Sequence, residues 1–463
     1  MAVAERGARL LPGDDDTIVA PATAPGRGAV ALIRMSGARA IEIARALGAF
    51  GGAHGAAPAP RVQQLCTLRH PDGSLLDQAL VAAFPAPRSY TGEDVVELAT
   101  HGGLVSPAIV MAACVAAGAR AALPGEFTRR AVLNGRMDLL QAEAVADMVD
   151  ARTRAMQQQA LQQLDGGLSR RLLVLRDDVI HLEALLAYDI DFPEEDDGPI
   201  APARIEAAAQ ALHAALQALL RTAPRGAMVR DGVLVVVAGP PNAGKSSLFN
   251  ALLGQSRAIV TPIAGTTRDA IEALLDRTPL PLRLVDTAGL RETDDEVERL
   301  GIEVSGRYLA QAQVVLACGA SAADVQHTLG VIMQRTDAQV VPVRTKCDAD
   351  MPAGAALPDG TVLVSAERAD GLAVLLHAID RAAQLAAPVN DDLVITRERH
   401  RVGLTAARDE LEAFLSVWSS GALPAPVAAV HLLTAREAIS ELIGTVDTED
   451  VLDRVFRDFC IGK

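Results

Sequence analysis

Residues 239–246, with the sequence Gly-Pro-Pro-Asn-Ala-Gly-Lys-Ser, constrain this chain more than any other stretch. They follow the unbroken apolar run 233–237, which is typical of a buried parallel strand. Residues 247–253 predict a helix that ends at Gly254. A strand, a glycine-rich loop and a helix form the context in which backbone N–H groups cradle phosphates. We therefore predict a P-loop, in preference to an ordinary glycine turn that fits the pattern.

Length and composition limit the class of protein. A chain of 463 residues predicts two to four domains. Its longest apolar runs fall short of a membrane span, and its first residues lack a signal-peptide core, so we expect a cytoplasmic protein with no membrane partner. Five scattered cysteines make a disulfide framework or a structural zinc site improbable. With a formal charge of −15, any RNA contact must come from local basic patches or from a partner.

Hydrophobic periodicity divides the chain into four ranges. Short strands, turns and helices predict an α+β domain over 1–123. Helical periodicity covers 124–226 and returns at 387–463, while strands alternate with helices over 227–386. The fold class is therefore multidomain: an α+β domain, then a discontinuous all-α helical domain interrupted by an inserted α/β P-loop domain with a parallel sheet.

The expected elements are short and regular. The strands are expected at 17–20, 29–34, 64–69, 78–84, 95–98, 233–237, 282–285, 314–317, 340–343 and 362–364. Helices are expected at 40–47, 105–117, 404–418 and 426–443. The acidic run 189–197 predicts a solvated loop between two helices rather than a metal site, because no histidine accompanies it and Pro193 marks a break.

The phosphate-binding residues can be assigned roles by their chemistry. Lys245 would reach the β- and γ-phosphates, and the Ser246 hydroxyl would bind Mg²⁺. The Asp-Thr-Ala-Gly segment 286–289 follows a predicted strand, where a carboxylate can hold Mg²⁺ through water and a backbone N–H can contact the γ-phosphate. Between them, Thr267 is the candidate for a second hydroxyl on Mg²⁺ that closes only around a γ-phosphate.

The base is indicated by residues 345–348, Thr-Lys-Cys-Asp. The Asp348 carboxylate can accept from guanine N1–H and N2–H₂, a pairing that adenine cannot offer. Ser365 and Ala366 would offer a backbone N–H to guanine O6. Thr345 stands where Asn is usual, which removes an amide. In this order and spacing, the motifs predict a Ras-like GTPase.

The predicted nucleotide site comprises Asn242, Ala243, Gly244, Lys245, Ser246, Ser247, Thr261, Ile263, Gly265, Thr266, Thr267, Asp286, Thr287, Ala288, Gly289, Thr345, Lys346, Asp348, Ser365 and Ala366.

Along nearly its whole length the sequence resembles the MnmE (TrmE) family of tRNA-modification GTPases. The matching segments are 16–20, 25–28, 90–95, 101–103, 124–127, 190–193, 241–246, 263–269, 295–299 and the terminal 459–463, Phe-Cys-Ile-Gly-Lys. The resemblance implies modification of C5 of the wobble uridine, U34, in certain tRNAs. It also implies a homodimer formed by the N-terminal domain, an FAD-bearing MnmG-like partner in a heterotetramer, and 5,10-methylene-tetrahydrofolate as one-carbon donor. Glycine and ammonium both stay open as the amine source.

The resemblance also assigns a potassium site and a catalytic carboxylate. No arginine finger is evident in the sequence, and a monovalent cation beside the β/γ bridge could stabilise the same developing charge. By the family pattern, K⁺ is bound by Asn242, Thr261, Ile263 and Thr266. Glu298 matches the family's water-orienting carboxylate and joins Lys245 and Thr267 as catalytic residues. Without the resemblance, Glu298 would be interpreted as a solvated charge.

The resemblance implies a folate site in the first domain. Arg34, Glu97, Arg136 and Lys463 match positions that contact the folate, with Arg136 standing where the family often has Lys. A pterin needs a carboxylate and its glutamyl tail needs cations, although structural roles for Arg34 and Glu97 fit the residues equally well. Cys460 is expected to be buried in the terminal motif, as a reactive thiol near the substrate base or as part of the tail's packing.

Two other function classes stay open. A ribosome-assembly or RNA-binding GTPase without modification chemistry would need a basic module, and none is visible in the sequence. A folate-binding module with a vestigial GTPase gains slight support from Thr345 and from residues 318–320, Cys-Gly-Ala. It is opposed by the intact residues Lys245, Ser246, Thr267, Asp286 and Gly289.

Overall fold

The computed structural model divides the chain into two compact units. Unit 1 contains residues 1–146 and 440–463, and unit 2 contains residues 147–439. The structure describes residues 13, 15–51, 58–191, 201–255, 258–259, 271–277, 279–286, 308–348, 356–386, 394–420, 424–444, 455–456, 459–460 and 462. Within these residues no helix is both long and apolar enough to cross a membrane.

Unit 1 is built on a six-stranded sheet with the order β3-β4-β5-β2-β1-β6. Its strands are β1 (Ile18–Pro21), β2 (Val30–Ser36), β3 (Gln64–Arg69), β4 (Leu75–Phe84), β5 (Val95–His101) and β6 (Arg120–Ala121). The short β6 was not expected; it pairs parallel to β1, whereas the other pairs are antiparallel. The five predicted strands of this domain are confirmed.

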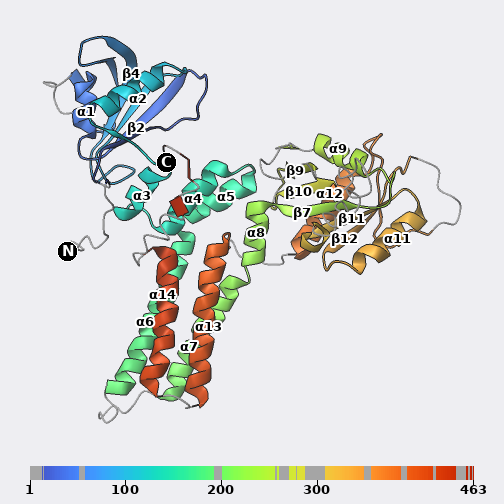
Figure 1. The fold of residues 1–463 in the computed structure, drawn as a ribbon. Coiled ribbons are helices and arrows are strands. Elements are labelled where there is room, and N and C mark those ends of the chain that lie inside the picture. The colour runs from blue at the N-terminus through green and yellow to red at the C-terminus, as the bar shows by residue number, and fades with distance from the viewer. Residues whose placement is uncertain are drawn as a thin grey trace, which may run out of the picture. The chain divides into compact units, whose positions relative to one another are not determined.

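Alternation along the strands gives the sheet one buried face. Ile33, Leu98 and Val81 point into a core shared with helices α1 (Ala40–Ala46) and α2 (Ser106–Ala116), which lie together against the sheet (Figure 1). The intervening residues of β2, β5 and β4, among them Arg34 and Glu97, therefore belong to the opposite face.

The end of the chain packs within unit 1. Phe456 and Phe459 lie in a hydrophobic cluster with Leu139. The N–H of Gly125 donates to the carbonyl of Cys460 over 3.3 Å. Gly462 has a φ of +94°, and a Cβ there would lie 2.1 Å from the carbonyl oxygen of Pro21. Only glycine therefore fits where the terminal segment passes the end of β1.

The helices on either side of the inserted domain pack together. The helices are α3 (Glu126–Leu133), α4 (Leu139–Asp150), α5 (Arg154–Leu164), α6 (Gly167–Asp191), α7 (Pro202–Leu220), α8 (Ala223–Asp231), α13 (Glu398–Ser420) and α14 (Ala425–Ile443). In Figure 1, α6, α7, α13 and α14 run side by side; α13 contacts α7, and Arg436 of α14 pairs with Glu183 of α6 over 2.8 Å. The helices expected after the insert are confirmed, while the bounds of the four expected ranges stay a prediction.

One helix runs further than expected. Asp189 was placed in a loop, but α6 continues to Asp191. The physical reason is that nothing breaks the helix before Pro193, which disfavours helical backbone only at the residue that precedes it. The remainder of the acidic run, 192–197, lies outside the described residues.

The inserted domain is a seven-stranded sheet with the order β13-β12-β11-β7-β10-β9-β8. Its strands are β7 (Val233–Ala238), β8 (Ala258–Ile259), β9 (Ile271–Leu275), β10 (Leu282–Asp286), β11 (Val314–Gly319), β12 (Gln339–Arg344) and β13 (Val362–Leu363). One face is covered by α9 (Lys245–Gln255) and α12 (Leu372–Ala386), and the other by α11 (Ala322–Met333). The five predicted strands are confirmed.

The five expected strands pair parallel, as predicted, and two further strands extend the sheet in antiparallel pairing at one edge. β9 pairs antiparallel to β10, and β8 pairs antiparallel to β9. Neither segment was expected as a strand, since β8 has only two residues and β9, Ile-Glu-Ala-Leu-Leu, has no clear alternation. The pairing partner supplied by β10 decides the conformation of β9, which is a non-local effect.

Candidate functional site

The P-loop lies between β7 and α9, as predicted. Asn242 and Gly244 have φ values of +60° and +79°, so the loop turns through left-handed backbone at two points. Gly239 passes so close to β11 that a Cβ would lie 2.3 Å from the Cys318 carbonyl oxygen. The Lys245 ammonium, which is largely buried, donates to the carbonyls of Gly239 and Pro240 over 3.0 and 2.8 Å. The loop thus holds its cation at the N-terminus of α9, where an anion is favoured.

The sheet brings Asp286 beside this loop. β10 is the parallel neighbour of β7, and Asp286 is in register with Val237, one residue before the strand end. Because parallel strands end at the same edge, the buried Asp286 carboxylate and the P-loop share that edge. Ser246, in the first turn of α9, has an exposed side chain. A hydroxyl and a carboxylate form an oxygen donor set that suits Mg²⁺.

Residues 345–348 meet the P-loop on its other side. The Thr345 hydroxyl donates to the carbonyl of Ala243 and lies 3.1 Å from that of Gly319. The Lys346 ammonium donates to the carbonyl of Asn242 over 2.9 Å. Two consecutive side chains therefore fasten this loop to the P-loop, and the departure from Asn at Thr345 leaves the connection in place.

A cavity of about 210 Å³ opens between these two loops. The lining residues named in the sequence analysis are Gly244, Ser247, Thr345, Lys346, Asp348 and Ala366. A hydrogen bond from the Ser365 hydroxyl holds the pKa of Asp348 below its ordinary value, so the carboxylate stays ionised and accepts. The structure thus gathers the P-loop and the predicted base-binding residues around one cavity.

Ten predicted site residues lie outside the described part of the chain. They are Thr261, Ile263, Gly265, Thr266, Thr267, Thr287, Ala288, Gly289, Glu298 and Lys463. Their roles stay predictions. The described residues contain no group of three histidine, cysteine or acidic side chains that could hold a metal ion.

The candidate folate residues of unit 1 include a cross-strand ion pair. Arg34 and Glu97 are directly opposite on β2 and β5, and the guanidinium lies 2.8 Å from the carboxylate. The Tyr90 and Phe127 rings lie 5.3 and 5.9 Å from the Arg34 guanidinium, within the range of cation–π contacts. Arg136 donates from Nε to the carbonyl of Ser89, the neighbour of Tyr90, over 3.1 Å. Three of the four predicted residues therefore converge, and the fourth, Lys463, lies outside the described residues.

Cys460 differs from the expectation. Its thiol is exposed rather than buried. Phe459 and Gly462 face the domain: the Phe459 ring is buried, and Gly462 lies against the backbone of Pro21. Cys460, which lies between them in the chain, faces away. The expected burial of Cys460 is wrong for this reason.

A buried ionic network beneath this site was not predicted. Arg130, only 2% exposed, donates to Glu126 over 3.0 Å and to Glu93 over 3.2 Å. Burial alone would raise the pKa of Glu126, but hydrogen bonds from Arg120 and the Leu123 N–H, with the charge of Arg130, lower it overall. The sequence did contain one indication of this network: Glu126 and Arg130 are four residues apart, a spacing at which opposite charges pair on a helix.

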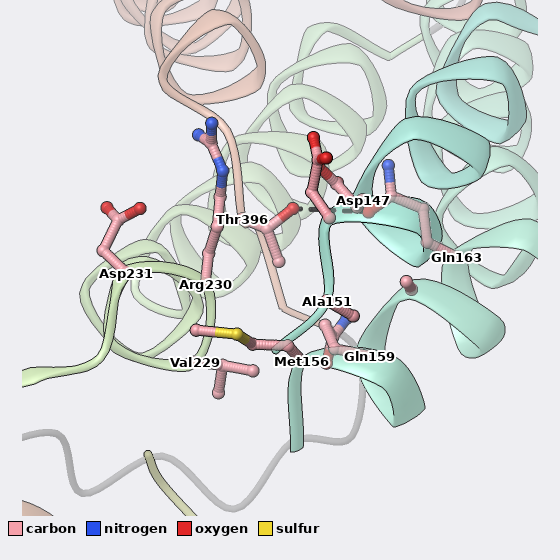
Figure 2. A pocket seen from close by; sticks show the side chains of 11 residues that line it. Asp147, Ala151, Met156, Gln159, Gln163, Val229, Arg230, Asp231 and Thr396 are labelled. Carbon is pink, nitrogen blue, oxygen red and sulfur yellow. Dashed lines mark hydrogen bonds between the residues drawn. The ribbon is translucent and has the colours of Figure 1, made fainter. Parts of the chain in front are cut away.

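A second cavity, of about 140 Å³, lies where the chain enters and leaves the inserted domain (Figure 2). Asp147, Met156, Val229 and Thr396 are among its lining residues, and the Thr396 hydroxyl donates to Gln163 over 3.3 Å. None of the predicted site residues lines it, so it is separate from the nucleotide cavity.

Comparison with known proteins agrees with this architecture. Residues 17–136 match the family model described as the GTP-binding protein TrmE N-terminus, and residues 139–460 match that of the MnmE helical domain. The proteins named tRNA modification GTPase MnmE from Dechloromonas aromatica (strain RCB) and Methylobacterium radiotolerans are 41% and 45% identical. Each match covers 97% of this chain, and 99% and 100% of the respective relative. The G domain of the T. maritima FeoB iron transporter matches with 25% identity over 33% of this chain and 99% of that domain; its TM-score of 0.25 is too low to support an argument.

Proposed function

The chain belongs to the MnmE family of tRNA modification GTPases, and on that premise we propose that it takes part in modifying C5 of the wobble uridine, U34. The reaction adds an aminomethyl or carboxymethylaminomethyl group and takes its carbon from 5,10-methylene-tetrahydrofolate. An MnmG-like partner supplies FAD and joins a homodimer of this chain in a heterotetramer. GTP hydrolysis by the GTPase domain controls when the reaction proceeds. The cytoplasmic location of the protein stays a prediction.

One observation carries the nucleotide part of this proposal: the cavity between the P-loop and residues 345–348. Its lining offers Lys346 and an ionised Asp348 on one side and the start of α9 on the other. A purine seated there would present its N1–H and exocyclic amine to Asp348, which favours guanine. The phosphates would then extend toward Lys245, whose ammonium exchanges the carbonyls of Gly239 and Pro240 for phosphate oxygens.

The base assignment can be tested by Asp348→Asn. The amide donates where the carboxylate accepts, so it suits xanthine, which carries a carbonyl at C2. We expect the variant to hydrolyse xanthosine triphosphate and to lose activity with GTP. Asp359→Asn, an exposed change outside the cavity, should leave GTP preferred. Unchanged GTP preference in Asp348→Asn would contradict the assignment.

Mg²⁺ and K⁺ have defined places in the proposal. Ser246 and Thr267 would hold Mg²⁺, and Asn242 with Thr261, Ile263 and Thr266 would hold K⁺; both ions supply positive charge to the β/γ-phosphate oxygens. Among these residues, the oxygen donors that the structure describes at Asn242 and Ser246 fit such cations. Glu298 would orient the attacking water.

Potassium dependence can be tested with Asn242→Gly. Glycine keeps the left-handed backbone at this position and removes only the side-chain oxygen. We expect wild-type GTP hydrolysis to be faster in K⁺ than in Na⁺, and this difference to shrink in the variant. Equal wild-type rates in the two salts would count against the potassium site.

The folate and dimer assignments rest on unit 1. Arg34 and Glu97 offer a cation and a carboxylate over one aromatic pair, which suits a pterin with an anionic tail. On the same sheet face, Leu65 of β3 and Leu80 of β4 are directly paired and are 71% and 42% exposed. An exposed apolar pair on a sheet face is consistent with contact to a second copy of the domain.

A further inference from the structure

Four arginines gather around the segment 88–90 of unit 1. Arg61 donates to the carbonyl of Arg88, Arg136 donates to the carbonyl of Ser89, and Arg34 lies over the ring of Tyr90. Three consecutive residues thus each contact a different guanidinium, and Arg88 supplies a fourth. From residue 90 back to residue 88, the contacting guanidiniums follow in the order Arg34, Arg136 and Arg61.

Only one of the four arginines is neutralised. Arg34 pairs with Glu97, whereas Arg61, Arg88 and Arg136 are exposed and none pairs with a carboxylate within the described residues. On a chain with a net charge of −15, three adjacent uncompensated arginines form an unusual surface. A guanidinium presents a planar fork of N–H donors that matches carboxylate and phosphate oxygens. The surface therefore has the chemistry of an anion-binding site.

We propose that Arg61, Arg88 and Arg136 bind the successive carboxylates of a poly-γ-glutamyl tail on the folate. This inference rests on the proposed folate function of Arg34 and Glu97. A short carboxylate chain that leaves a pterin at Arg34 would meet Arg136 and then Arg88 and Arg61. An RNA backbone fits less well, because RNA needs an extended basic footprint.

The test is calorimetric titration of the full-length protein with tetrahydrofolate carrying one or three glutamates, without oxygen. We expect the triglutamate to bind about tenfold more tightly, since several charge-assisted contacts of modest strength add together. High salt should reduce that advantage, because the contacts are exposed. Arg61→Gln and Arg88→Gln should each reduce it while leaving monoglutamate affinity unchanged.

Two comparisons keep the test specific. Arg69→Gln removes an exposed arginine from the β3–β4 hairpin, where it bonds to Gly73, and should keep the full triglutamate advantage. Misfolding would not explain an effect of Arg88→Gln. The Arg88 side chain makes no hydrogen bond among the described residues, and the bond from Arg61 goes to the Arg88 backbone carbonyl, which the substitution keeps.

The outcomes separate this inference from the function on which it rests. If the monoglutamate fails to bind, the folate function itself is overturned. If wild-type protein binds both forms equally, folate binding stands and the tail site is overturned. If Arg61→Gln and Arg88→Gln weaken binding of an anticodon stem-loop RNA but keep the triglutamate advantage, the surface belongs to RNA and the proposal is wrong.

Discussion

At the scale of single residues, Thr345 holds two parts of the nucleotide site with one hydroxyl. The carbonyls of Ala243 and Gly319 both lie within hydrogen-bond distance of its Oγ1, yet a hydroxyl has one proton to donate. An Asn amide at this position would have two. The sequence identified the loss of an amide, but not that the remaining hydroxyl would be used on the P-loop.

Replacing Thr345 by Val keeps the shape and removes the donor. We expect the loss to cost the inserted domain about 1–3 kcal/mol, because the buried Ala243 carbonyl loses this donor, while the Gly319 carbonyl keeps the Thr345 N–H. GTP affinity should fall with it, since the P-loop loses one of its two side-chain tethers and keeps only that of Lys346. Thr345→Ser should retain both properties, and Thr345→Asn should bind GTP at least as tightly as wild type. Chemical denaturation and nucleotide titration measure these effects, and wild-type behaviour in Thr345→Val would refute the tether.

Glu126 gives unit 1 a pH-dependent stability. Its folded pKa is lowered from an ordinary value of 4.5, so its contribution is present above that pH and is lost as pH falls through the lowered pKa. Glu126→Gln should remove this acid-sensitive part and cost about 3 kcal/mol at neutral pH, because Arg130 stays buried with fewer anionic partners.

The unfolding midpoint, followed from neutral pH into the acid range, measures this effect of Glu126. Glu42→Gln is the matched control, since Glu42 pairs with Arg39 on the exposed side of α1 and should change stability little. Parallel acid profiles for wild type and Glu126→Gln would contradict a structural role for the network.

At the scale of elements, the two segments that connect the inserted domain to the helices are fastened to each other. The N–H of Ile395 donates to the Thr222 hydroxyl over 3.1 Å, just before α8 begins. Gly226 in α8 lies so close to the returning segment that a Cβ would stand 1.9 Å from the Ile395 carbonyl oxygen. This close approach adjoins the cavity in Figure 2, whose lining includes Val229 and Thr396.

Gly226→Ala should separate these two segments. Alanine normally stabilises a helix relative to glycine, but here the added methyl meets backbone, which has little freedom to move. We expect a lower unfolding temperature. Gly254→Ala, near the end of α9 with no atom within 4 Å of the new methyl, should match or exceed wild type. Equal unfolding temperatures for Gly226→Ala and wild type would contradict this account, because they would mean that the two segments can separate without loss of stability.

Local patterns predicted the elements, and non-local contacts decided what was missed. β7, the P-loop and α9 follow from adjacent residues, so periodicity and the glycine-rich loop were sufficient, although α9 continues through Gly254 to Gln255 instead of ending there. β9 forms because β10 is available to pair with it, and the Glu126–Arg130–Glu93 network joins segments far apart in the chain. Cys460 is exposed because its neighbours in the tail, and not the cysteine, face unit 1. The sequence of the tail alone does not indicate which of these residues face inward.

At the scale of the whole molecule, the chain returns to its first domain at its end. Residues 440–463 belong to unit 1, and the terminal segment passes β1 beside the strand that carries Arg34. The GTPase domain lies in unit 2, between these two parts of the sequence. The candidate folate residues and the nucleotide cavity therefore belong to different units, which is consistent with a GTPase that times chemistry performed elsewhere.

The central claim, that this GTPase serves modification of wobble uridines, is tested most directly by nucleoside analysis of tRNA from cells that lack the protein. We predict loss of the C5 aminomethyl-type groups at U34, restored by the wild-type chain and not by Lys245→Ala, which removes the phosphate-binding ammonium. Normal wobble uridines in the deficient cells would contradict the account.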